Sequence, residues 1–203
     1  MKLILFDFDG VLANTTEISY KIHAEKNKGL TKERWQEFAF GNFWENYNKA
    51  VKEGKHIPAD DNYYDSYKKA LDTLNIHDVL HESILSLAKD YKLAIISSSN
   101  SSYINDFLEK EGILKYFSDV FGVDTHTSKI LKIKNILQKY DLKPKDAVFI
   151  TDTLGDIKEA NECKVKSIGV TWGLHEREIL EREKPFKIIG NPADLVKTIK
   201  EIL

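Results

Sequence analysis

Two aspartates, Asp7 and Asp9, stand one residue apart directly after the apolar run 3–6. A short apolar run of this kind predicts a buried strand, so both carboxylates lie where the strand ends and the chain turns at Gly10. Crowded carboxylates repel each other unless a positive charge lies between them. A divalent cation is the obvious partner, because hard cations prefer carboxylate and carbonyl oxygens. The plainer alternative is a polar turn, since Asp and Gly are common turn residues.

Polar residues follow three further apolar runs, and they supply a hydroxyl cluster, an ammonium and two more carboxylates. They are Ser97, Ser98, Ser99 and Asn100 after run 93–96, Lys129 beyond run 120–123, and Thr151, Asp152 and Asp156 after run 147–150. Each group has a plain explanation when taken alone, such as a helix N-cap, a solvated lysine or a turn. Their joint placement on successive strand ends favours a functional site.

Phosphoryl transfer through an enzyme carboxylate requires this combination of groups. An aspartate nucleophile can form an aspartyl-phosphate, and the remaining catalysis is mostly positioning and neutralisation of charge. Mg²⁺ held by acids shields an anionic nucleophile as it approaches an anionic phosphate. An ammonium, a hydroxyl and backbone N–H groups bind the other oxygens. A second carboxylate can protonate the leaving oxygen and later deprotonate the hydrolytic water.

A parallel sheet would bring these residues together, and the chain from about residue 78 onward has the alternation that such a sheet requires. We expect strands at 93–96, 120–123, 147–150, 167–170 and 186–189, and helices at 80–89, 101–111, 128–140, 155–162 and from 191–192 onward. Strands alternating with helices predict a parallel sheet covered on both faces. The predicted fold class is α/β, with a Rossmann-like three-layer core whose strand carboxyl ends share one edge.

Residues 14–77 predict a helical insert between the first strand and the second, which must lie over or beside the edge where the strands end. Segments 15–28, 31–52 and 61–74 look helical, and Thr31 is the expected N-cap of the second. Aromatic residues recur in this region at mixed helical spacing: Trp35, Phe38, Phe40, Phe43, Trp44 and Tyr47. We interpret them as a small helical core rather than as a substrate-stacking surface.

Composition excludes few classes of protein. The 203 residues are 42% apolar and 31% charged, with a net charge of -2, which gives no global reason to expect nucleic acid or a membrane as partner. Cys163 is the single cysteine, so no disulfide and no cysteine metal cluster is expected. The sequence shows neither a signal peptide nor a long apolar span, and a cytoplasmic enzyme is the expectation.

The motifs resemble those of the haloacid dehalogenase-like (HAD) hydrolase superfamily, in the branch that resembles phosphoglycolate phosphatase and β-phosphoglucomutase. The resemblance rests on the segment 7–12, on Ser97, on Lys129 and on the segment 152–156, which occur in the family's order. The segment 169–173 also matches the usual tail of this branch. The resemblance implies a Mg²⁺-dependent phosphatase that hydrolyses a small phosphorylated metabolite through an aspartyl-phosphate.

The resemblance implies that residues 14–77 form a small all-helical cap domain, inserted into a catalytic core of residues 1–13 and 78–203. It also implies a role for each matching residue. Asp7 would be the nucleophile and Asp9 the general acid/base. Phosphate would bind to Ser97, Ser98 and Lys129, and Mg²⁺ to Asp7, Asp9, Asp152 and Asp156, with Asp9 contributing its backbone carbonyl.

Three departures from the family pattern bear on this reading. Asn14 stands where an acid is common, and Thr151 replaces a usual glycine. Ser19 stands where β-phosphoglucomutases have a histidine. This departure argues against the alternative function, a phosphosugar mutase. The alternative from another class is a non-catalytic phosphate-binding or phospho-signalling module.

The remaining polar side chains give weaker signals. Metal-ligand spacing is absent among the six histidines, His23, His56, His77, His81, His126 and His175. His126 and His175 could face the site, but we favour surface or packing roles for these two. Cap lysines such as Lys21, Lys49 and Lys52 could meet a substrate anion.

Overall fold

The computed structural model describes all 203 residues apart from the side chain of Asp61. It contains one six-stranded parallel sheet in the order β3-β2-β1-β4-β5-β6. The strands are β1 Leu3–Phe6, β2 Lys92–Ile96, β3 Phe117–Phe121, β4 Ala147–Thr151, β5 Lys166–Val170 and β6 Lys187–Ile189. The α/β class predicted from the alternation of strands and helices is confirmed.

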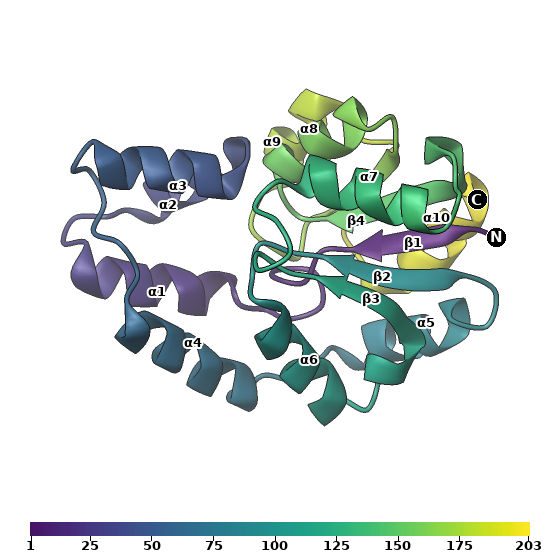
Figure 1. Cartoon of the computed structure of the whole chain (residues 1–203), viewed down its shortest axis with the longest axis horizontal. Coiled ribbons are helices and arrows are strands. Elements are labelled where there is room, and N and C mark those ends of the chain that lie inside the picture. Colours follow the sequence, from purple (N-terminus) through teal and green to yellow (C-terminus); the bar gives the residue numbers. More distant parts are fainter.

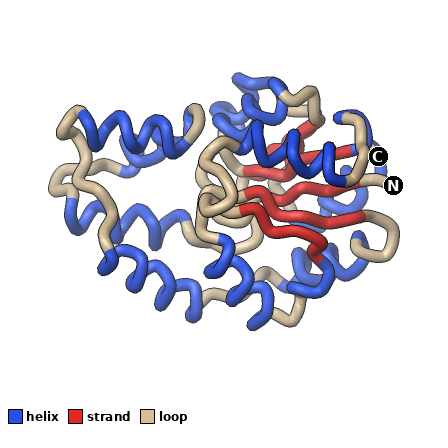
Figure 2. Tube along the Cα trace, viewed as in Figure 1, coloured by secondary structure: helices blue, strands red, loops and turns tan.

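Helices cover both faces of the sheet, because alternate side chains of a strand point to opposite faces. Ile4 and Phe6 of β1 belong to an apolar cluster with residues of α5, α6 and α10. Leu3 and Leu5 belong to a second cluster with residues of α7 and α8. Figures 1 and 2 show the three resulting layers. The helices are α5 Asp78–Leu87, α6 Ser101–Lys110, α7 Lys129–Lys139, α8 Leu154–Glu162, α9 Arg177–Leu180 and α10 Leu195–Ile202.

Four further helices lie beyond the carboxyl ends of the strands, at the left of Figure 1. They are α1 Thr16–Lys26, α2 Lys32–Gln36, α3 Phe43–Lys52 and α4 Asp61–Thr73. Thr31 caps α2 as expected, because its hydroxyl accepts a hydrogen bond from the Arg34 backbone N–H. These helices therefore face the edge of the sheet where the predicted site residues emerge.

The helix predicted over 31–52 is wrong in one respect, since the chain breaks into α2, the 3₁₀ turn Glu37–Phe40 and α3. Gly41 is extended there, and Asn42 caps α3 by accepting from the Glu45 N–H. The break brings the backbone at Gly41 onto α8: a Cβ on Gly155 would lie 2.1 Å from the Gly41 carbonyl oxygen. Close packing between two backbones thus overrides local helix propensity at this point.

The strand predicted at 120–123 begins three residues earlier and ends at Phe121. Ser118 and Asp119 interrupt the apolar pattern from which the strand was predicted. Such polar residues are tolerated because β3 lies at the edge of the sheet. The short helix α9 was not predicted. The terminal helix begins as a single 3₁₀ turn, Pro192–Asp194, before α10.

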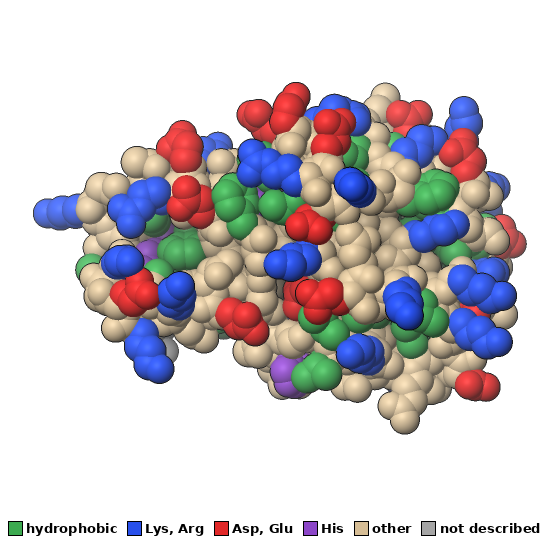
Figure 3. Space-filling model, turned by 90° about the horizontal axis from the view of Figure 1, so that it is seen from above, with side chains coloured by type: hydrophobic (Ala, Val, Ile, Leu, Met, Phe, Trp, Pro, Cys, Tyr) green, Lys and Arg blue, Asp and Glu red, His purple; other side chains and the backbone are tan. Residues whose placement is uncertain are grey.

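Charges of both signs are interspersed on the face of the molecule that Figure 3 shows, in line with the small net charge. Among the helices described, none combines the length and the apolar character that crossing a bilayer requires.

A buried histidine pair, His23 and His56, lies among helices α1–α4. His23 Nδ1 lies 3.1 Å from His56 Nε2, and the His23 ring lies 4.3 Å from the ring of Trp35. Burial, and then the neighbouring His56, lower the pKa of His23 to about 3.

We expect acid to destabilise the packing of helices α1–α4 around this histidine pair. Below its ordinary pKa of 6.5 the unfolded His23 binds a proton, whereas the folded one stays neutral down to about pH 3. Stability is therefore fully present above pH 6.5 and falls as the pH drops, by up to about 1.4 kcal/mol per pH unit. Thermal melting at pH 7.5 and pH 5 should show a larger loss for wild type than for His23→Gln. His126→Gln, at an exposed histidine, should behave like wild type.

Candidate active site

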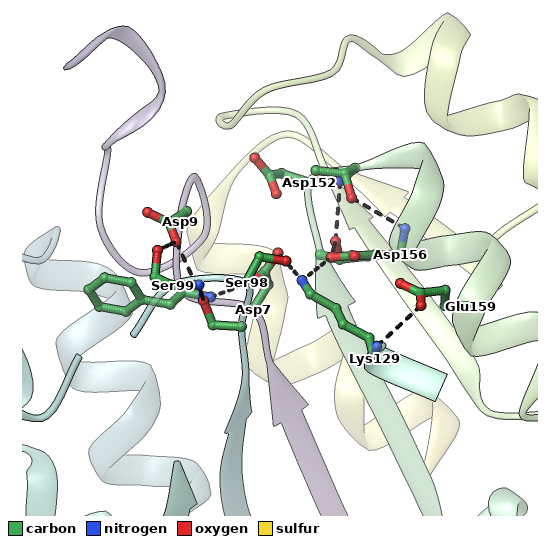
Figure 4. A network of polar contacts seen from close by, with 12 residues as sticks. Asp7, Asp9, Ser98, Ser99, Lys129, Asp152, Asp156 and Glu159 are labelled. Carbon is green, nitrogen blue, oxygen red and sulfur yellow. Dashed lines mark hydrogen bonds and ion pairs between the residues drawn. The ribbon is translucent and has the colours of Figure 1, made fainter. Parts of the chain in front are cut away.

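The sheet brings the predicted site residues together at its carboxyl edge. Phe6, the last residue of β1, pairs with Ile95 of β2 and with Ile150 of β4. The polar residues after these three strands therefore emerge side by side, as Figure 4 shows for Asp7, Ser98 and Asp152. Lys129 reaches the same place from the first turn of α7, whose N-cap is Ser128.

Lys129 bridges two carboxylates at the centre of the site. Its Nζ lies 2.8 Å from Asp7 Oδ2 and 2.6 Å from Asp156 Oδ2, and all three side chains are buried. Burial acts to lower the pKa of Lys129, but Asp156 and Asp7 outweigh it and hold that pKa above its ordinary value. The lysine is thus a fixed positive charge beside Asp7.

Asp7 lies in an environment that disfavours its own charge. Burial raises the pKa of its carboxyl well above the ordinary value; Lys129 opposes this, while Asp156 and Asp152 add to it. The backbone N–H of Phe8 donates to Asp7 Oδ1 at 2.7 Å, which fixes the orientation of the carboxylate. Burial and the neighbouring acids therefore disfavour the charged form of Asp7 even with Lys129 in place.

The two acids after β4 have different partners. Asp156, in the first turn of α8, accepts from the Thr151 hydroxyl at 2.7 Å, so the threonine that departs from the family pattern gains a hydrogen-bonding role here. Asp152 Oδ2 accepts from the Leu174 N–H at 2.7 Å, whereas its Oδ1 is buried without a partner. Burial raises the pKa of Asp152 to about 7.

The donor set fits a hard divalent cation. Such an ion would give the unpartnered Asp152 Oδ1 a ligand to bind. It would also offset the negative charge of the acids around Asp7. Space for the Asp152 carboxylate depends on two glycines: a Cβ on Gly10 would lie 1.9 Å from Asp152 Oδ2, and one on Gly173 would lie 2.2 Å from it. Among the described residues, no three His, Cys, Asp or Glu side chains already stand at metal-ligand spacing.

Asp9 is surrounded by hydroxyl groups. Its Oδ1 accepts from Thr15 Oγ1 at 2.7 Å and from the Tyr67 hydroxyl, and its Oδ2 accepts from Ser99 Oγ at 2.6 Å and Ser97 Oγ at 3.4 Å. An ionised carboxylate only accepts hydrogen bonds, so four hydroxyl donors suit its charged form.

The predicted serines take different positions. Ser97 is fully buried, and its hydroxyl also accepts from the Ser99 N–H at 3.0 Å. Ser98 and Ser99 line the adjoining cavity together with Lys129, and among the described lining residues Ser97 is absent. In this conformation Ser97 therefore supports Asp9, and Ser98 and Lys129 are the predicted phosphate ligands that reach the cavity.

Sequence reasoning missed three residues of the site. Thr15 and Tyr67 contact Asp9 from outside the strand-end motifs, and Tyr67 lies 58 residues away on α4. Lys132 is fully buried and donates to the carbonyls of Ser97 and Gly122. Burial, and then Lys129, lower its pKa to about 8. Only the position of Lys132, one turn after Lys129 on α7, gave a signal in the sequence.

Besides the contacts of Thr15 and Tyr67 with Asp9, further polar contacts join the segment of helices α1–α4 to the core around this site. Trp44 Nε1 donates to the Ser98 carbonyl at 3.1 Å, and Gln36 Nε2 donates to the Leu174 carbonyl at 2.8 Å. Asn42 Nδ2 donates to Glu159 at 3.0 Å. The His175 ring lies between the Leu154 N–H and the Gln36 carbonyl. Burial lowers the pKa of His175 to about 4, so the ring is neutral.

Comparison with known proteins identifies the family of this chain. The model of the family described as haloacid dehalogenase-like hydrolase matches residues 4–170. A pyrophosphatase PpaX from Listeria innocua is 25% identical over 98% of this chain and 96% of its own length. A phosphoglycolate phosphatase from Vibrio vulnificus is 25% identical over 54% of this chain, and the match spans about half, 49%, of that relative.

A solved structure supports the fold over the whole chain. A haloacid dehalogenase-like family hydrolase from Streptococcus pneumoniae superposes with a TM-score of 0.76 at 20% identity, over 98% of each chain. The matched residues 4–170 include both carboxylate pairs, Lys129 and helices α1–α4. Because the match covers well over half of the sequence, the chain belongs to the haloacid dehalogenase-like hydrolases.

Proposed function

We propose that this hydrolase is a Mg²⁺-dependent phosphatase that acts on a small phosphorylated metabolite, with Asp7 as nucleophile. The observation that carries the proposal is the buried Asp7 carboxylate, oriented by the Phe8 N–H and held 2.8 Å from the Lys129 ammonium. Two of the relatives named above are phosphatases by name, which supports the same reaction class.

In the first step an Asp7 oxygen attacks phosphorus, and the bond from phosphorus to the leaving oxygen breaks. Asp9 gives its proton to the leaving oxygen, which departs as an alcohol. Lys129 balances the negative charge on the transferred oxygens, and the Ser98 hydroxyl binds one of them. The product is a mixed anhydride, with the phosphoryl group on Asp7.

In the second step water attacks phosphorus, and Asp9 takes the proton of that water. Phosphate leaves, and the Asp7 carboxylate is regenerated with Asp9 again protonated. The hydroxyls of Thr15, Tyr67 and Ser99 hold the Asp9 carboxylate between these proton transfers, because they can donate to its charged form.

Asp7, Asp152, Asp156 and the backbone carbonyl of Asp9 are the groups that we propose hold Mg²⁺. When bound, the ion supplies positive charge that shields the approach of the Asp7 carboxylate to the phosphate. The orphaned Asp152 Oδ1 supports this assignment.

We also propose that residues 14–77 form a cap that closes the site to bulk water. The contacts of Trp44, Gln36 and Asn42 with the core support this role. Ser19, which lines the cavity where mutases have a histidine, lies 3.4 Å from the Tyr63 hydroxyl. A hydroxyl there provides no second acid/base for returning the phosphoryl group to a substrate, so hydrolysis is favoured over mutase activity.

Removal of the metal is the direct test. Purified protein should release phosphate from an aryl phosphate in the presence of Mg²⁺, lose that activity in EDTA, and regain it when excess Mg²⁺ is added back. The loss should reach at least about a hundredfold, because several kcal/mol of charge stabilisation depend on the ion. Full activity in EDTA after extensive dialysis would contradict the metal assignment.

A further inference from the structure

The cap side of the cavity has a chemical character that the phosphoryl site does not require. The cavity has a volume of about 360 Å³, which is typical of a small-molecule site. Asp7, Asp9, Asp152 and Asp156 line its floor. Much of the remaining wall is aromatic: Trp35, Phe43, Trp44, Tyr47, Tyr63, Tyr64, Tyr67 and Tyr103. The aromatic residues that we expected to serve only as a cap core thus also face the cavity in several cases.

Positive charge is confined to the floor of the cavity. Lys129 is the sole lysine or arginine among the described lining residues, and its ammonium is already paired with Asp7 and Asp156. The lining histidine, His23, stays neutral because it is buried. Three cap lysines considered as anion ligands lie outside the lining: Lys21, Lys49 and Lys52.

A substrate anion on that side of the cavity would therefore lose hydration without gaining a cationic partner among the described lining residues. Transferring an unpaired charge from water into such a site costs several kcal/mol or more. The faces of aromatic rings carry negative partial charge, so they repel anions and attract flat apolar groups.

Several of the rings have their polar atoms engaged by the protein itself. The Trp44 Nε1 donates to the Ser98 carbonyl, and the Tyr47 hydroxyl accepts from the Ala59 N–H at 2.6 Å. The Tyr67 hydroxyl is engaged with Asp9. What these side chains offer a ligand is mainly apolar ring surface.

We propose that the substrate is a phosphate monoester whose leaving group is uncharged and has a flat apolar face, such as an aromatic alcohol or a nucleoside. The inference rests on the proposed phosphatase activity. It separates this chain from relatives named for phosphoglycolate and pyrophosphate, because both compounds carry negative charge beyond the transferred group.

Three synthetic esters test the inference on the wild-type protein: ethyl phosphate, benzyl phosphate and 4-carboxybenzyl phosphate. All three release an alkyl alcohol of similar acidity, so differences report binding of the leaving group. We expect kcat/KM for benzyl phosphate to exceed that for ethyl phosphate by at least about tenfold, through burial and stacking of the ring. The added carboxylate should reduce kcat/KM by at least about tenfold.

Each other outcome has a definite meaning. Equal kcat/KM for ethyl and benzyl phosphate overturns recognition of a flat face, and equal values for the two benzyl esters overturn the exclusion of anions. A higher value for phosphocholine than for benzyl phosphate overturns the proposal in favour of a cationic leaving group. In all these cases the protein is still a phosphatase. If it hydrolysed none of the esters in the presence of Mg²⁺, the proposed phosphatase activity itself would be refuted.

Matched variants separate ring contact from structural support. Trp44→Ala should raise KM for benzyl phosphate. It should also lower the ratio of kcat/KM for benzyl phosphate to kcat/KM for ethyl phosphate at least about threefold. Trp44→Phe, which keeps a ring but loses the hydrogen bond to Ser98, should retain most of that ratio. Equal losses in both variants would contradict ring contact. Phe186→Ala, at an exposed ring outside the cavity, is the control and should retain the wild-type ratio.

A charge-gain variant at a partly exposed ring of the lining tests the exclusion of anions directly. Tyr64 lines the cavity and is 38% exposed, so a lysine can replace it and still reach water. Tyr64→Lys should raise kcat/KM for 4-carboxybenzyl phosphate relative to benzyl phosphate about tenfold. An unchanged ratio in the folded variant would contradict the claim that a missing cation excludes anionic leaving groups.

Discussion

Asp7→Asn should abolish phosphate release, by at least about 10⁴-fold, while the protein remains folded. An amide of nearly the same shape cannot act as the nucleophile, so the covalent route is closed. The fold should tolerate the change, because burial and the neighbouring acids already disfavour the Asp7 charge, and Lys129 keeps Asp156 as a partner. Steady-state phosphate release and thermal melting, measured on the same preparation, check both parts.

Asp194→Asn, an acid-to-amide change at an exposed residue outside the cavity, is the matched control and should keep the wild-type rate. An active Asp7→Asn variant would remove the nucleophile assignment. An inactive variant that is also unfolded would be uninformative about chemistry, and the melting curve identifies that case.

Asp9→Asn should reduce turnover of alkyl phosphates by about 10²- to 10⁴-fold, the usual contribution of a general acid/base. The loss in the first step should be smaller for 4-nitrophenyl phosphate, because nitrophenolate leaves without a proton. Since the second step also needs Asp9, the phosphoryl group should then accumulate on Asp7. Mass spectrometry of the acid-quenched protein detects that adduct, and rapid-quench kinetics gives the rate of each step.

Tyr67→Phe is the comparison that isolates the proton. It removes one hydroxyl donor from Asp9 but keeps the carboxyl, so a loss of only about three- to tenfold is expected, equivalent to one hydrogen bond. The loss should be similar for alkyl and nitrophenyl esters. If both variants lost the same activity and neither depended on the leaving group, Asp9 would be a positioning residue and not the acid.

The sequence predicted those parts of the site that follow from strand ends. Asp7, Asp152 and Lys129 could be located because each follows a recognisable apolar run, and parallel strands place such residues along one edge. The break at Gly41 could not be predicted, since it depends on contact with Gly155 of α8, 114 positions further on.

The surroundings of Asp9 were beyond sequence reasoning for a similar physical reason. Tyr67 reaches Asp9 only because α4 packs beside α1 and α6. The sequence around a tyrosine on a helix does not indicate such a contact. The aromatic residues of the cap were interpreted as core from their spacing. Spacing on a helix cannot distinguish a ring buried by protein from one that lines a cavity.

The order of strands in the sheet also has a consequence for how the chain acquires its structure. β1 is central, but both of its neighbours lie far along the chain, since β2 begins at Lys92 and β4 at Ala147. During synthesis the most apolar strand thus appears first and remains unpaired for about 90 residues, while the cap helices can form from local contacts. The pairing of β1 with β4 closes a long loop, a step of high contact order that favours slow folding. The carboxyl edge that carries Asp7 is consequently among the last parts of the molecule to be assembled.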